Sequence, residues 1–225
     1  FDMKSFDINI DQGSLVSLIL ILLVFVPMLL CVAFMTIIER KAMGSMQRRI
    51  GPNVVGYYGV LQPFADALKL VVKEQIIPAQ SNKALFFLAP MISLVFSLLG
   101  WATIPFGSGM AITDISLGML FSLAVSSIGV YGALFAGWAA NSKYAFLGSL
   151  RSTAQMVSYE LIFSTCVAAV ILLAGSLNFT TIVEAQTSIW FIVPLFPLFI
   201  MYLISALAEL NRTPFDLPEA ESELV

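Results

Sequence analysis

Five long apolar runs divide this sequence, and they constrain its fold more than any other feature. They span residues 15–38, 84–104, 117–140, 154–175 and 189–208. Glu160, in the fourth run, is the only Asp, Glu, Lys or Arg residue within them. A hydrocarbon layer of about 30 Å requires about 20 apolar residues in helical form. Each run is long enough to cross a bilayer as a helix.

The residue types within these runs favour helices over the strands of a membrane barrel. Barrel strands are shorter and alternate apolar with polar residues, whereas these runs are continuously apolar. Charged residues make up 11% of the chain, against roughly a quarter in a soluble domain. The sequence predicts an all-α polytopic membrane protein, with residues 1–225 forming a single membrane domain.

The basic residues predict the orientation of the chain. Ten of the eleven Lys and Arg residues lie in the first, third and final connections, and only Lys4 lies on the other side. Cytoplasmic connections carry such an excess. We therefore expect the N-terminus to face outside.

One segment of the first connection has the pattern of an interfacial helix, predicted near residues 63–75. Pro63 suits a first helical position, and Asp66, Lys69 and Lys73 share one polar stripe. The segment is too short to span a bilayer and amphipathic enough to lie at its surface. Asp66 could pair with one of the arginines that follow the first run. A helix of this kind beside a spanning helix would make a slot for an apolar ligand with a polar head.

Acidic residues are the candidates for chemistry. A carboxylate within a spanning helix is costly, so the default interpretation of Glu160 is a functional one. The alternative is a structural hydrogen bond, to Tyr159 or a serine. A second group follows the fifth run, in an acidic loop at 209–225 that holds Glu209, Asp216, Glu219, Glu221 and Glu223. On charge alone, this loop could equally be a solvated surface.

Histidine is absent, and the two cysteines lie inside apolar runs. These residues offer no ligand set for zinc, haem or an iron–sulfur cluster. We expect no metal site and no redox centre in this chain.

Three segments together resemble subunit 1 of respiratory complex I, the proton-pumping NADH:quinone oxidoreductase, in its organellar form. The first runs from Glu39-Arg40-Lys41 through Arg48-Arg49-Ile50-Gly51-Pro52 to Asp66. The second runs from Gly137-Trp138 to Ser158-Tyr159-Glu160, and the third from Ala208-Glu209 through Arg212 and Asp216 to Val225. The resemblance extends from the first apolar run to the last residue.

The resemblance implies roles for individual residues. Arg40, Arg49, Phe64 and Asp66 match the region of the quinone tunnel and its mouth. Arg212 and Asp216 match a loop beneath the quinone site. The residues that match an acidic path from the quinone cavity into the membrane arm are Tyr159, Glu160, Glu209, Glu219, Glu221 and Glu223.

The resemblance also implies partners and a location. Quinone would be the substrate, while FMN, NADH and iron–sulfur clusters would bind to partner subunits. The expected membrane is the mitochondrial inner membrane, or alternatively the bacterial plasma membrane. The family pattern continues past Val225 with further helices, so we expect either a second chain that supplies them or a longer chain. Two alternatives remain, a membrane subunit of a related hydrogenase and a stand-alone ion transporter.

Overall fold

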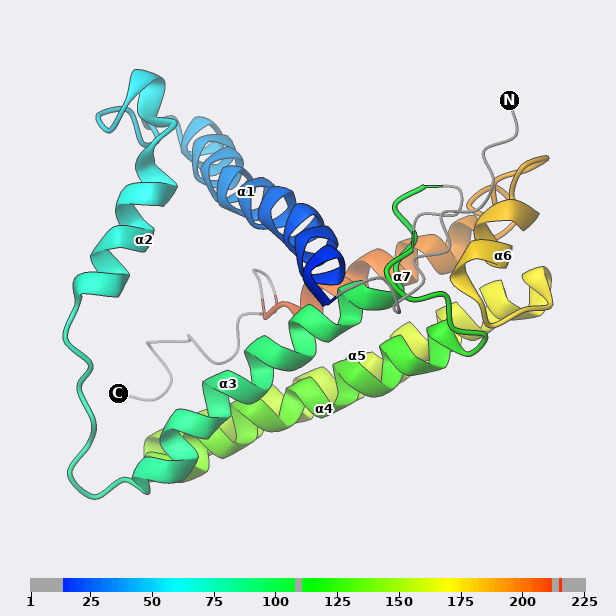
Figure 1. Ribbon diagram of the computed structural model, residues 1–225. Coiled ribbons are helices and arrows are strands. Elements are labelled where there is room, and N and C mark those ends of the chain that lie inside the picture. Colours follow the sequence, from blue (N-terminus) through cyan, green and yellow to red (C-terminus); the bar gives the residue numbers. More distant parts are fainter. Residues whose placement is uncertain (1–13, 108–110, 212–214, 216–225) are drawn as a thin grey trace. The chain divides into compact units, whose positions relative to one another are not determined.

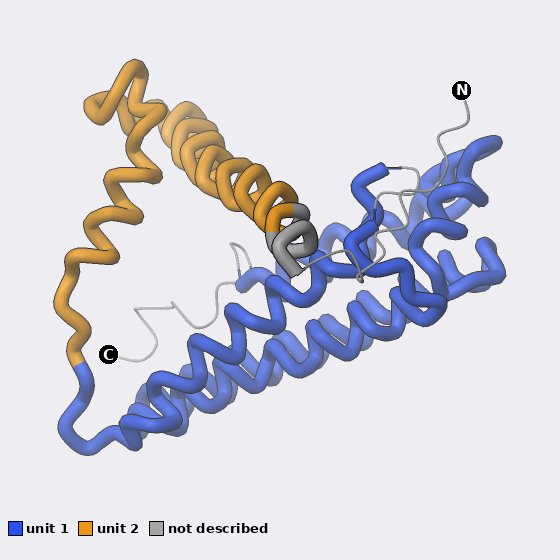
Figure 2. The backbone as a smooth tube through the Cα atoms, in the orientation of Figure 1, with its two compact units in different colours: residues 1–6, 77–225 blue, residues 7–76 orange. Residues whose placement is uncertain are grey.

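The computed structural model describes residues 14–107, 111–211 and 215, and all regular structure within them is helical (Figure 1). It comprises seven α-helices and two short 3-10 helices in this described part. The chain divides into two compact units, one of residues 7–76 and the other of residues 1–6 and 77–225 (Figure 2). The predicted all-α fold class is confirmed.

The first unit contains helix α1 (Ser14–Met46), the 3-10 helix η1 (Tyr57–Gly59) and helix α2 (Gln62–Val72). α1 continues beyond the predicted end of the apolar run and so carries Glu39, Arg40 and Lys41 on its last turns. The chain then folds back closely, because a Cβ atom on Gly51 would lie 3.1 Å from the Cα atom of Lys41. Gly59 requires glycine, since its φ is 76° and a Cβ atom there would lie 2.2 Å from Pro52 O.

The second unit is a bundle of helices α3 (Lys83–Gly100), α4 (Gly118–Ala139), α5 (Lys143–Ala174) and α7 (Phe196–Glu209). The 3-10 helix η2 (Trp101–Thr103) extends α3, and the short helix α6 (Phe179–Ala185) joins α5 to the segment before α7. α4 packs against both α3 and α5, and α5 also packs against α7. The order of contacts is therefore α3, α4, α5, α7.

Two glycines let α4 approach its neighbours closely. A Cβ atom on Gly132 would lie 1.9 Å from Ser93 Oγ on α3, and one on Gly137 would lie 2.0 Å from Ser149 Oγ on α5. Small residues at helix contacts are typical of membrane bundles, where packing rather than the hydrophobic effect drives association. These contacts hold α4 and α5 in fixed register, which places the site described below.

Four helical segments of the described residues are long and apolar enough to cross a membrane: Ile21–Met46, Lys83–Thr103, Gly118–Ala139 and Lys143–Ala174. α7 is apolar but shorter. It begins at Phe196 rather than near residue 189, and turns occupy the segment before it. Pro194 and Pro197 favour this late start, because proline lacks an N–H group and suits the first turn of a helix, where Pro197 lies.

Candidate functional site

Glu160 lies on α5 and faces two serines of α4. Its Oε1 atom accepts a hydrogen bond from Ser126 Oγ at 3.0 Å and another from Ser127 Oγ. The glutamate side chain is half-buried. A carboxylate between apolar helices needs such donors, because burial without a partner is costly. The sequence left open a structural hydrogen bond from Glu160 to a serine, and that bond is observed. It fixes the position of the carboxylate.

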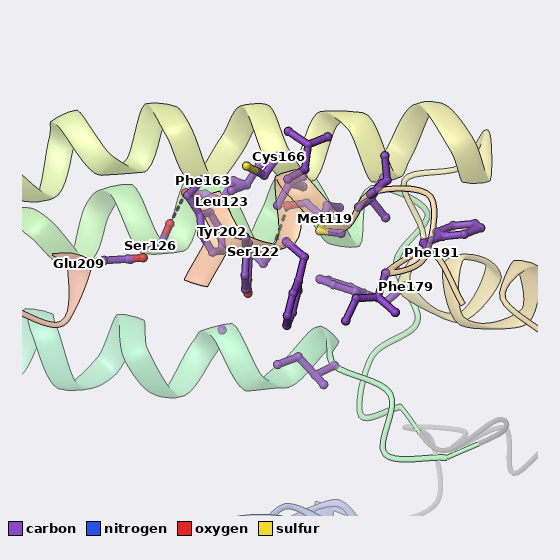
Figure 3. Close-up of a pocket in the computed structure, with 18 of the residues that line it drawn as sticks. Met119, Ser122, Leu123, Ser126, Phe163, Cys166, Phe179, Phe191, Tyr202 and Glu209 are labelled. Atoms are coloured by element: carbon purple, nitrogen blue, oxygen red, sulfur yellow. Dashed lines mark hydrogen bonds between the residues drawn. The ribbon is translucent and has the colours of Figure 1, made fainter. Parts of the chain in front are cut away.

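A cavity of about 940 Å³ lies within the same bundle and is lined mainly by apolar side chains (Figure 3). Glu209, the last residue of α7, lies at one end, and Phe179 and Phe191 lie at the other. Ser126 also lines the cavity, so one serine both borders this space and binds Glu160. Glu209 therefore lines this cavity directly, and Glu160 is joined to its wall through Ser126.

The aromatic residues next to these acids pack against one another. The ring of Tyr159, on α5, meets the ring of Phe215 edge to face at a centroid distance of 5.4 Å. Phe163 and Tyr202 lie 4.8 Å apart in the wall of the cavity. Five further predicted residues lie outside the described residues, namely Arg212, Asp216, Glu219, Glu221 and Glu223.

A second group of predicted residues meets in the unit formed by α1 and α2. Arg40 Nη1 on α1 donates to Asp66 Oδ2 on α2 at 2.6 Å, and this ion pair is partly exposed. Gln62 Nε2 donates to the other carboxylate oxygen at 3.0 Å. Phe64 packs edge to face against Phe34 of α1, with the ring centroids 6.0 Å apart. One polar and one aromatic contact thus join the two helices.

The charge of Asp66 is stabilised by these partners. The hydrogen bond from Arg40 is the largest cause that lowers the pKa of Asp66 below its ordinary value, and the hydrogen bond from Gln62 follows. Donors to an ionised carboxylate favour the charged form. Asp66 is therefore ionised at neutral pH, as the pairing with a guanidinium group requires.

Arg49 is placed apart from this pair. Its Nε atom donates to Gln47 Oε1 at 2.8 Å, within the turn that follows α1. Lys41, which also follows the first apolar run, donates to the carbonyl of Tyr58 and lies 5.9 Å from the centre of that ring. Lys41 thereby ties α1 to the η1 loop.

The sequence predicts part of these two groups, namely an arginine as the partner of Asp66 and a serine as the alternative partner of Glu160. It does not identify which serines bind Glu160, because Ser126 and Ser127 have the size of residues that serve helix packing, and it predicts no role for Gln62. A pair of adjacent hydroxyls in an apolar helix is the available signal for the two serines. No group of three metal-ligating side chains occurs within the described part of the chain.

Comparison with known proteins bears directly on these groups. The family model for NADH dehydrogenase matches residues 19–225. The chain belongs to this NADH dehydrogenase family. The family resemblance seen in the sequence is confirmed, and it covers both groups of residues described above.

Individual relatives agree with the family match. The chain is 73% identical over 211 residues to NADH-ubiquinone oxidoreductase chain 1 of Mycosarcoma maydis, covering 94% of this chain and 64% of that protein. It is 56% identical over 221 residues to a bacterial relative, an NADH-quinone oxidoreductase subunit of Rhodospirillum centenum, covering 97% and 66%. A relative from Podospora anserina is 62% identical, with 58% of its length covered. The chain thus spans less than two thirds of the length of these relatives.

Proposed function

We propose that this chain is a membrane subunit of complex I that forms part of the quinone-binding tunnel and part of the acidic path that couples quinone reduction to proton translocation. The observation that carries the proposal is the serine-anchored Glu160 on α5, in a chain of the NADH dehydrogenase family. An ionisable residue kept inside a membrane bundle is a typical part of a proton relay.

The α1–α2 unit supports a role at the mouth of the quinone tunnel. The Arg40–Asp66 pair offers polar groups, and Phe34 and Phe64 offer an aromatic surface on the same two helices. This combination suits a ligand with a polar head and a long apolar tail. Arg40, Asp66 and Phe64 would guide the quinone, with Arg49, Arg212 and Asp216 as further quinone-site residues.

The bundle supports a role in moving protons away from the quinone. Quinone reduction to quinol takes up two electrons and two protons, so it changes the charge of its surroundings. Glu209 and Glu160 would respond to this change and pass it along the path. Tyr159, Glu219, Glu221 and Glu223 would be the remaining members of this path.

The proposal requires other chains. Electrons would come from NADH through FMN and iron–sulfur clusters held by partner subunits, including those next to the quinone site, while neighbouring membrane subunits would receive the coupling signal. The relative from Rhodospirillum centenum is named as one subunit of an oxidoreductase, which fits such an assembly. The proposed location is the mitochondrial inner membrane, with the N-terminus on the intermembrane side, and the alternative is a bacterial plasma membrane.

Mass spectrometry of the native-gel band that contains this chain, with an activity assay of that band, tests the proposal. We expect iron–sulfur subunits, NADH-dependent quinone reduction, and loss of that activity with inhibitors of the quinone site. A band with hydrogenase activity that quinone-site inhibitors do not affect would favour the related hydrogenase. Migration of the chain alone, with ion flux in liposomes, would favour the transporter.

A further inference from the structure

Gln155 occupies an unusual position at the end of the bundle where α7 finishes. It lies on α5, its side chain is only 7% exposed, and its Nε2 atom donates to two backbone carbonyls. One is Ala208 O at 2.7 Å, and the other is Phe215 O at 2.8 Å. A single amide group therefore binds both the last turn of α7, at Ala208, and Phe215.

The neighbouring contacts lie on the same side of α5. Ser152 Oγ accepts from Asn211 Nδ2 at 3.2 Å, and the ring of Tyr159 packs against that of Phe215. Ser152, Gln155 and Tyr159 are spaced by three and four residues, so they share one face of the helix. This face therefore contacts Ala208, Asn211 and Phe215.

The hydrogen bonds fix the orientation of the amide. A flipped amide would place Oε1 against two carbonyl oxygens, which cannot donate, so Nε2 must face them. Oε1 is then buried and has no hydrogen-bond partner among the described residues, and Asn211 Oδ1 is in the same condition. An unpaired buried acceptor costs free energy, so the two bonds made by Nε2 are what holds the amide in this orientation.

The residues that Gln155 binds are next to acidic residues in the sequence. Ala208 immediately precedes Glu209, Phe215 immediately precedes Asp216, and Gln155 lies on the same helix as Glu160. We propose that Gln155 is a positioning residue that sets the distance from Glu160 to Glu209. This inference rests on the proposed function, because a fixed spacing matters only if protons or charge pass between these acids.

The test compares Gln155→Met with Gln80→Met in the assembled complex. Methionine keeps the length of the side chain but donates no hydrogen bond, whereas Gln80 is exposed and its side chain makes no hydrogen bond among the described residues. We expect Gln155→Met to lower kcat for NADH:quinone turnover per assembled complex on the order of tenfold. The KM for quinone and the Gln80→Met variant should stay unchanged.

A double variant separates positioning from a general structural role. If Gln155 acts through Glu209, Gln155→Met should have little further effect on turnover in a Glu209→Gln background. Full additivity there, or normal kcat per assembled Gln155→Met complex, would overturn the inference. If Gln155→Met does not assemble, Gln155→Asn decides, because it keeps the donor but is too short to reach both carbonyls. We expect a reduced kcat, and an unchanged kcat would overturn the inference.

Failure of the proposed function would look different from failure of this inference. In the first case, the unmodified chain would not occur in a quinone-reducing complex at all. In the second, the unmodified complex would reduce quinone normally, and the Gln155 variants would do so equally well. The wild-type measurement therefore separates the two outcomes before any variant is compared.

Discussion

Ser126 Oγ on α4 lies 3.0 Å from Glu160 Oε1 on α5, and this hydrogen bond is reinforced by the hydroxyl of Ser127. The close approach of α4 and α5 at Gly137 makes the contact possible, because bulkier residues would separate the two helices. A glutamate on an apolar helix is thereby anchored to a neighbouring helix next to a cavity. The contribution of each serine can therefore be measured by replacing it with alanine.

The double variant Ser126→Ala/Ser127→Ala should lower the rate of proton pumping roughly tenfold, because Glu160 loses two hydrogen bonds of about 0.5–1.5 kcal/mol each. Each single variant should have a smaller effect, since the other hydroxyl still donates. Pumping by complexes reconstituted in vesicles provides the measurement. Ser122→Ala is the matched control, because Ser122 lines the same cavity but donates to Met119 O. An equal loss in that control would show that the cavity wall, and not the bond to Glu160, matters.

Asp66→Asn should raise the KM for quinone roughly two- to fivefold, an effect typical of a partly exposed ion pair. The reason is that Arg40 loses its anionic partner at the proposed tunnel mouth. Steady-state kinetics with a short-tailed quinone measure this change. Glu74→Gln removes an exposed carboxylate from the segment after α2 and should leave KM unchanged. An unaltered KM in Asp66→Asn would argue against a role for this pair in quinone entry.

The pKa of Asp66 should depend on its two hydrogen-bond donors. Its folded pKa is lowered, mainly by Arg40 and then by Gln62, so the link between α1 and α2 is at full strength above the unfolded pKa of about 3.9. That stabilisation is lost as the pH falls through the folded pKa. Infrared difference titration can follow the carboxyl group of Asp66, with Asp66→Asn as the reference that lacks it. The pKa of Asp66 should rise in Arg40→Gln and should rise less in Gln62→Leu. The reverse order would contradict the assigned causes.

Gly132→Ala should destabilise the α3–α4 contact by about 1–3 kcal/mol, the usual cost of overpacking. The new methyl group would meet Ser93 Oγ at 1.9 Å and Ala89 O at 3.0 Å. Gly129→Ala is the control on the same helix, because nothing lies within 4 Å of its Cβ position. Thermal denaturation of the assembled complex should show a lower midpoint for Gly132→Ala only. Equal midpoints would mean that this contact tolerates a side chain.

The helices could be predicted from the sequence because the length of an apolar run reports directly on the bilayer that it must cross. Their ends are harder to predict. α5 begins at Lys143, well before residue 154, because charged residues can extend a helix beyond the apolar layer. α7 begins late because two prolines occupy its expected first turns.

The site could be predicted only in part. Glu160 stands out in the sequence because a charge in an apolar helix is costly and requires a reason, and the pairing of Asp66 with an arginine could be predicted because both lie in the same connection. The sequence does not say which serine binds Glu160, since the pairing with Ser126 depends on the register of α4 against α5. The role of Gln155 is hidden for the same reason, because its two bonds reach residues far along the chain, at Ala208 and Phe215.

The most direct test of the coupling role is proton pumping by Glu160→Gln compared with Glu184→Gln. Glu184 is an exposed carboxylate on α6, so its neutral variant controls for the loss of one acid from the same bundle. We expect Glu160→Gln to assemble normally and to lose quinone-dependent turnover and pumping by about a hundredfold or more, the scale of a positioned proton-transfer group. Glu184→Gln should behave as wild type. Normal pumping by an assembled Glu160→Gln complex would contradict the role assigned to this residue.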